Sequence, residues 1–108
     1  MTFEDHVRAA LDSLPPEVAD ALRNVAVVVE DQNADDPELL GLYEGVPLPE
    51  RGDDAGSLPD TITIYRRPLE AEFRDPQELQ HEIRITVLHE IGHYFGLDEE
   101  RLAQLGYE

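Results

Sequence analysis

The chain has 108 residues and a formal net charge of −17, because 25 acidic residues face eight arginines and there is no lysine. A surface of this charge repels nucleic-acid phosphates and anionic membranes, so we expect neither as a partner and expect any charged partner to be basic. The lack of cysteine excludes a disulfide framework and a thiolate metal site.

The length and the hydropathy pattern indicate one domain, residues 1–108, with one modest core. No apolar run reaches the length of a membrane span, and the first residues lack the basic and hydrophobic parts of a signal peptide. We therefore expect a cytoplasmic protein. No pattern in the sequence indicates an oligomeric state.

The first part of the chain is predicted to form two helices and a strand. Residues 2–14 follow a capping-box pattern made by Thr2 and Asp5, and a short second helix, residues 17–23, follows two prolines. Residues 25–29 are a β-branched run bounded by polar residues, which is typical of a strand that is buried on both faces. This strand is our prediction for the interior of the sheet.

Two further strands are predicted on either side of a long loop. Residues 39–44 form the less regular one, in which Gly41 suggests a bulge or the close approach of another backbone. Residues 61–65 alternate between apolar and polar side chains, so this strand is expected to be half exposed. Residues 45–59 hold three prolines and three glycines and are predicted to be a loop.

A helix of about twenty residues is predicted next, over residues 75–95. Asp75 is its expected N-cap, Pro76 suits the first helical position, and Gly96 suits the left-handed residue that ends it. A final helix is predicted over residues 98–105. The long helix carries the chemically most informative stretch of the chain, His89-Glu90-Ile91-Gly92-His93.

Two histidines four residues apart project from one face of a helix, where both can bind one metal ion. The number of such matches expected by chance in this composition is on the order of 0.02. Imidazole nitrogens suit Zn²⁺, and two of them leave room for a third ligand and for a water whose pKa the metal lowers to about 7. His89 and His93 are thus the predicted ligands, and Glu90 is the predicted general base.

The third ligand is less clearly indicated. Glu99 is preferred by its position in the pattern, and Asp98 and Glu100 are neighbouring candidates. The alternative is that these acids are solvated and stabilise the first turn of the last helix. A set of two histidines and a carboxylate also binds iron or manganese, so the pattern alone does not identify the metal.

The stretch from His89 to Gly96 resembles the metzincin motif H-E-x-x-H-x-x-G-x-x-H, with Glu99 at the place of the last histidine. The metzincin Met-turn has no counterpart, because Met1 is the only methionine. Nearly the whole chain resembles the small bacterial zincin-like metallopeptidase family, through the Phe3 helix and residues 25–30, 41–45, 63–67 and 89–96. The resemblance implies a minimal zincin fold of class α+β, in which a small mixed sheet of three or four strands packs on a long metal-binding helix between N-terminal and C-terminal helices.

Three functions are compatible with these features. The first, which the resemblance implies, is a zinc-dependent peptidase whose oxyanion is stabilised by Tyr94 or Tyr107; an edge strand, residues 39–44 or 61–65, would then bind the peptide or protein substrate. The second is a catalytically weak or inactive zincin-fold module that binds metal and peptide. The third is an RNA-processing hydrolase, which the negative charge and the lone Glu90 disfavour.

Overall fold

The computed structural model describes residues 1–46 and 60–106, and the larger part of the predicted long loop lies outside these ranges. The described elements form two helices, then three strands, then three helices, and such segregated runs are typical of an α+β domain. In chain order they are α1 (Phe3–Asp12), α2 (Pro16–Ala21), β1 (Val25–Glu30), β2 (Gly41–Glu44), β3 (Asp60–Tyr65), α3 (Arg66–Glu72), α4 (Pro76–Tyr94) and α5 (Glu99–Leu105).

The described strands form one mixed sheet in the order β1-β3-β2. β1 runs parallel to β3, with Val25 opposite Asp60, whereas β2 runs antiparallel to β3, with Gly41 opposite Ile64. The predicted fold class, a small mixed sheet backed by a long helix, is therefore confirmed.

The predicted places of two strands in the sheet are wrong. β1, expected in the interior, lies at an edge, and its side chains alternate between half-buried and exposed, with Val28 38% exposed. β3, expected to be half exposed and named as a possible edge strand, lies in the centre, where even Thr63 is buried. β-branched composition indicates a strand in both cases, but it does not say which strand other strands flank.

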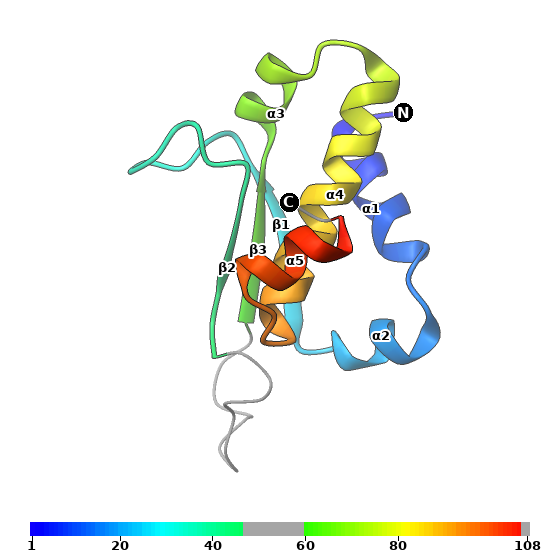
Figure 1. Cartoon of the computed structure of the whole chain (residues 1–108). Coiled ribbons are helices and arrows are strands. Elements are labelled where there is room, and N and C mark those ends of the chain that lie inside the picture. The colour runs from blue at the N-terminus through cyan, green and yellow to red at the C-terminus, as the bar shows by residue number, and fades with distance from the viewer. Residues whose placement is uncertain (47–59, 107–108) are drawn as a thin grey trace.

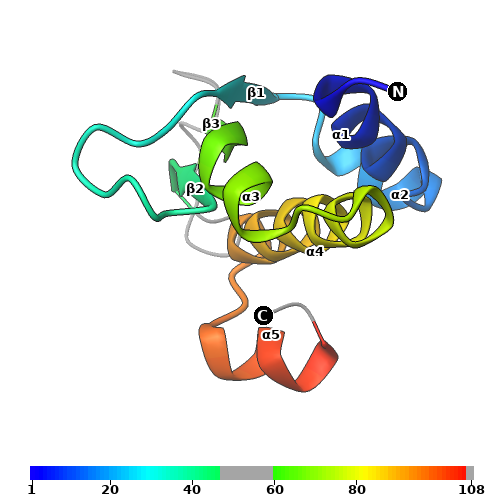
Figure 2. The same ribbon diagram turned by 90° about the horizontal axis from the view of Figure 1, so that it is seen from above.

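Helix α4 is the centre of the molecule, and the sheet, α1 and α5 are arranged around it (Figure 1). Seen from above in Figure 2, α5 lies on the opposite side of α4 from α1. The core fills the space between α1, α4 and the sheet with side chains such as Val7, Ile62, Ile64, Ile83 and Val87. No helix within residues 1–46 and 60–106 combines the length and the apolar character needed to cross a membrane.

Both ends of α4 follow the predicted signals. The Asp75 side chain accepts a hydrogen bond from the Glu78 backbone N–H at 3.3 Å, and Pro76 is the first helical residue. At the other end the N–H of Leu97 donates to the Gly92 carbonyl at 3.0 Å, and Gly96 takes a left-handed φ of 85°. This Schellman turn reverses the chain, so the segment after α4 returns toward its last turns.

Candidate metal centre

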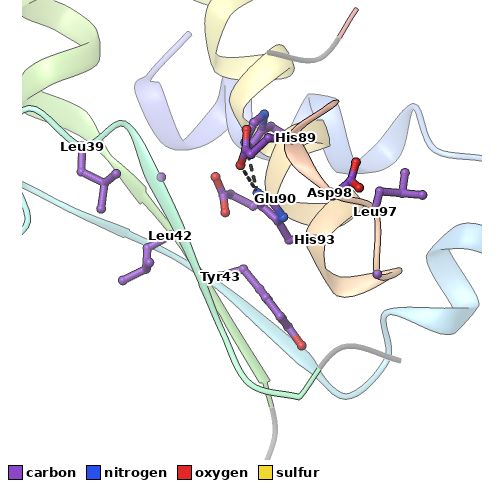
Figure 3. Close-up of a pocket in the computed structure, with 11 residues that line it drawn as sticks. Leu39, Leu42, Tyr43, His89, Glu90, His93, Leu97 and Asp98 are labelled. Carbon is purple, nitrogen blue, oxygen red and sulfur yellow. Dashed lines mark hydrogen bonds and ion pairs between the residues drawn. The ribbon is translucent and has the colours of Figure 1, made fainter. Parts of the chain in front are cut away.

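His89 and His93 lie side by side on the last two turns of α4, and dashed lines mark contacts at this site in Figure 3. Their Nε2 atoms are 3.2 Å apart. The Oε1 atom of Glu99, at the start of α5, lies 3.2 Å from Nε2 of His89 and 2.8 Å from Nε2 of His93. Among the described residues, His89, His93 and Glu99 form a group whose side chains could together hold a metal ion.

This triangle of donor atoms fits a tetrahedral metal site. Bonds from Zn²⁺ to imidazole nitrogen or carboxylate oxygen are about 2.1 Å long, which places neighbouring ligands of a tetrahedron about 3.4 Å apart. The three observed separations lie between 2.8 and 3.2 Å. His89, His93 and Glu99 could therefore hold one metal ion without rearrangement of the backbone.

Of the three neighbouring acids, Glu99 alone joins the histidines. The Asp98 carboxylate accepts a hydrogen bond from the Arg101 N–H at 2.8 Å and caps α5, while Glu100 is exposed and lies outside the group of possible ligands. Both roles predicted for this segment are thus found in it: Asp98 caps the helix, and Glu99 points to the histidines. Glu99 itself remains 70% exposed.

Glu90 is buried beside these atoms, with an exposed fraction of 7%. Its carboxylate accepts a hydrogen bond from the backbone of Tyr43 on β2. Burial raises the pKa of Glu90 above its ordinary value of 4.5, and the neighbouring Glu99 adds to this, whereas His89, His93 and the Tyr43 N–H act in the opposite direction. A carboxylate in this environment is a better proton acceptor near neutral pH than an exposed one.

A pocket of about 550 Å³ opens onto the three possible ligands and Glu90. Its other wall is β2, and Tyr43 lies across the pocket from the helix residues (Figure 3). Gly41 makes this close approach possible, because a Cβ there would lie 2.9 Å from Cγ2 of Thr86 and 3.1 Å from Cγ of Glu90. The sequence suggested a bulge or the close approach of another backbone at Gly41, whereas the atoms that approach it are side-chain atoms of α4.

Two residues of the pocket were not identified from the sequence. Tyr43 contributes its backbone N–H to Glu90, and its hydroxyl donates to Asp60 at 2.5 Å. Leu97 lines the pocket after the turn at Gly96. The signal for Tyr43 was its place in residues 39–44, one of the two strands predicted to bind substrate. Leu97 had no signal, since a backbone turn brings it to the site.

The two tyrosines predicted to assist at the oxyanion have different outcomes. Tyr94 is buried in the core, and its hydroxyl donates to the Ala21 carbonyl at 3.0 Å, so its predicted role is wrong. The reason is the helical period, because one residue beyond His93 faces about 100° away from it. Tyr107 lies outside the described residues.

A helix that carries two histidines and a buried glutamate, with a strand of a mixed sheet along one side, defines the zincin class of metallopeptidase folds. The chain belongs to the zincin-like metallopeptidase family, whose model matches residues 22–107. The match includes the whole sheet, α4 and α5, and leaves out α1 and α2. A comparison with curated proteins gives no match.

Proposed function

We propose that this chain is a zinc-dependent peptidase in which His89, His93 and Glu99 bind the ion and Glu90 is the general base. The observation that carries the proposal is the convergence of three donor atoms within 2.8 to 3.2 Å of one another beside a buried carboxylate. Membership of the zincin-like metallopeptidase family supports it.

When bound, Zn²⁺ would polarise the substrate carbonyl and make a neighbouring water acidic. Glu90 would then accept a proton from that water and later give it to the amine of the cleaved bond. The Tyr43 N–H holds the Glu90 carboxylate in place for both transfers. Desolvation of Glu90 in the pocket favours the first of these transfers, in which Glu90 takes up the proton, because the charged form has lost part of its hydration.

Strand β2 is our candidate for binding the substrate backbone. It forms a wall of the pocket, and among residues 1–46 and 60–106 no strand pairs with its outer edge. β3 is excluded from this role, because it lies between β1 and β2. An extended peptide could add to β2 by backbone hydrogen bonds. The carbonyl of the peptide bond to be cleaved would then lie near the face of α4 that carries His89 and His93.

A second candidate function is that of a zincin-fold module that binds a metal and a peptide with little or no cleavage. One observation favours it: the Glu99 side chain is 70% exposed, so its contribution to metal binding competes with hydration. The two candidate functions use the same metal site and differ in whether the bound peptide is cleaved. Neither involves nucleic acid, which the charge of −17 disfavours.

The deciding experiment measures zinc content and affinity, by metal analysis and calorimetry, for the wild type, His93→Ala, Glu99→Ala and Glu100→Ala. We expect stoichiometric zinc in the wild type, loss in His93→Ala and a decrease of at least about tenfold in affinity for Glu99→Ala. Glu100→Ala is the matched control, because it removes an adjacent exposed acid from the same turn of α5.

Cleavage of a peptide library then separates the two candidates. Zinc-loaded wild type should produce fragments, and zinc-loaded Glu90→Gln, which retains the ligands, should lose at least about a hundredfold in rate. Wild type that binds zinc but releases no fragment would favour the binding module. Equal zinc affinity in Glu99→Ala and Glu100→Ala would contradict the assignment of Glu99.

A further inference from the structure

A second cavity, of about 330 Å³, adjoins the metal pocket on the side of the first turns of α4. Leu39, Gly41, His89 and Glu90 line both cavities. We infer that this second cavity is a specificity subsite that receives an arginine or lysine side chain of a peptide substrate. The inference rests on the proposed peptidase or peptide-binding function and adds the substrate class.

The position of the cavity ties it to the cleaved bond. His89 and Glu90 stand between the two cavities, so a side chain in the second cavity would belong to a residue near the carbonyl that is attacked. Gly41 of β2 also lines both cavities and packs against Thr86 and Glu90 of α4. A peptide that lies along β2 would therefore pass both cavities. At about 330 Å³ the cavity has room for a lysine or arginine side chain.

The walls of the cavity are aliphatic. Leu39 and Leu40 line it from the segment that leads into β2, and Ile85 lines it from α4. All three are half-buried. The methylene stem of lysine or arginine gains from contact with such walls while its charged end stays near water.

Three carboxylates lie around the same cavity, those of Asp36, Glu38 and Glu82. None of them forms an ion pair within 4.0 Å with a residue in the described ranges, and no arginine is among the residues that line the cavity. A basic side chain would place its charge among uncompensated negative charges, whereas an acidic one would be repelled. Aliphatic walls combined with carboxylates therefore match the two parts of lysine and arginine side chains.

Matched peptides test this subsite. A library is prepared in which one position at a time is fixed as lysine, norleucine or glutamate, because norleucine keeps the aliphatic stem and lacks the charge. Zinc-loaded wild type should prefer lysine over norleucine by about tenfold at one position beside the cleaved bond and should reject glutamate. The double variant Glu38→Gln/Glu82→Gln should reduce that preference to about twofold or less.

The control is Glu72→Gln, which removes one exposed charge at the end of α3, away from both cavities, and should leave the preference unchanged. The preference should also fall in high salt, since the carboxylates are partly exposed. Equal cleavage of lysine and norleucine peptides by the wild type, or an undiminished preference in the double variant, would overturn the inference.

A measurement of peptide binding distinguishes a failure of the proposed catalysis from a failure of the proposed subsite. Fluorescence anisotropy of the same labelled peptides with zinc-loaded Glu90→Gln, which needs no turnover, should show the lysine preference and its loss when Glu38→Gln/Glu82→Gln is added. Binding with this preference but without cleavage by the wild type would leave the subsite standing and reject the peptidase. Cleavage without charge preference would leave the peptidase standing and reject the subsite, and binding without charge preference would also reject the subsite.

Discussion

Leu102 of α5 packs so closely against Gly92 of α4 that a Cβ on residue 92 would lie 2.3 Å from Cδ2 of Leu102. Leu102 is fully buried, so a Cβ at residue 92 would require either the Leu102 side chain or α5 to shift. Gly92 lies inside the His89-to-His93 motif, and α5 carries Glu99. The missing side chain at Gly92 thus allows the third donor to reach the two histidines.

The Gly92→Ala substitution should weaken zinc binding by displacing α5. Alanine gains about 1 kcal/mol of helix propensity over glycine, but overpacking of a filled site costs about 1–3 kcal/mol, so a net loss of stability is expected. We expect the zinc affinity, measured by calorimetry, to fall about tenfold or more. Adding Leu102→Val removes the clashing methyl group and should restore part of the affinity. Wild-type affinity in Gly92→Ala would contradict this account.

The Gly41→Ala substitution should impair turnover while zinc binding is kept. The added Cβ would press on Thr86 and Glu90 and force β2 away from α4, which displaces the proposed general base but none of the three metal-binding candidates. We expect kcat/KM for a cleaved library peptide to fall at least about tenfold, with unchanged calorimetric zinc affinity.

A second substitution supplies the control for Gly41→Ala. Thr86→Ser removes Cγ2, the nearest atom to the added Cβ, and keeps the hydroxyl that donates to the Glu82 carbonyl. Combined with Gly41→Ala it should recover part of the lost activity. If zinc affinity falls in parallel with activity, the contact acts on the ligands and the assignment of Gly41 to the general base is wrong.

The raised pKa of Glu90 predicts how stability depends on pH in the metal-free protein. The folded state holds the Glu90 proton more tightly than the unfolded state, so the free energy of unfolding should decrease as the pH rises from the ordinary pKa of 4.5 to the raised value. Each unit of pKa difference corresponds to about 1.4 kcal/mol.

Glu90→Gln removes this dependence, so the comparison with the wild type isolates it from the other carboxylates. In urea titrations with a chelator from pH 4 to 8, the variant should gain stability relative to the wild type as the pH rises, and the gain should level off above the raised pKa. A constant difference between the two proteins over that range would show that Glu90 is not desolvated.

The Tyr94→Phe substitution should affect stability and leave chemistry intact. Its hydroxyl donates to the Ala21 carbonyl at the end of α2, so its removal should lower the free energy of unfolding by about 1 kcal/mol in denaturant titrations. Because this hydroxyl faces the core, kcat and zinc affinity should not change. A loss of kcat of tenfold or more at unchanged stability would return Tyr94 to the oxyanion role.

Local patterns predicted the described helices other than α3, and the chemistry of α4, because their causes lie within a few residues. The caps at Thr2, Asp75 and Asp98 and the turn at Gly96 depend on backbone groups three to five positions away. The spacing of His89 and His93 follows in the same way from the helical period. Register also pointed to Glu99, but the competing role of its neighbour Asp98 as a helix cap was equally local, so the sequence left both open.

The sequence by itself determined the element types, the α+β class and the pair of histidines with Glu90. Only the tertiary structure decided that β3 is central and β1 lies at an edge, that Tyr43 holds Glu90, and that Glu99 meets the histidines. The physical reason is the range of the interactions. Strand order and the docking of α5 depend on contacts between residues far apart in the chain, such as β1 with β3, and strand propensity carries no information about which partner a strand takes.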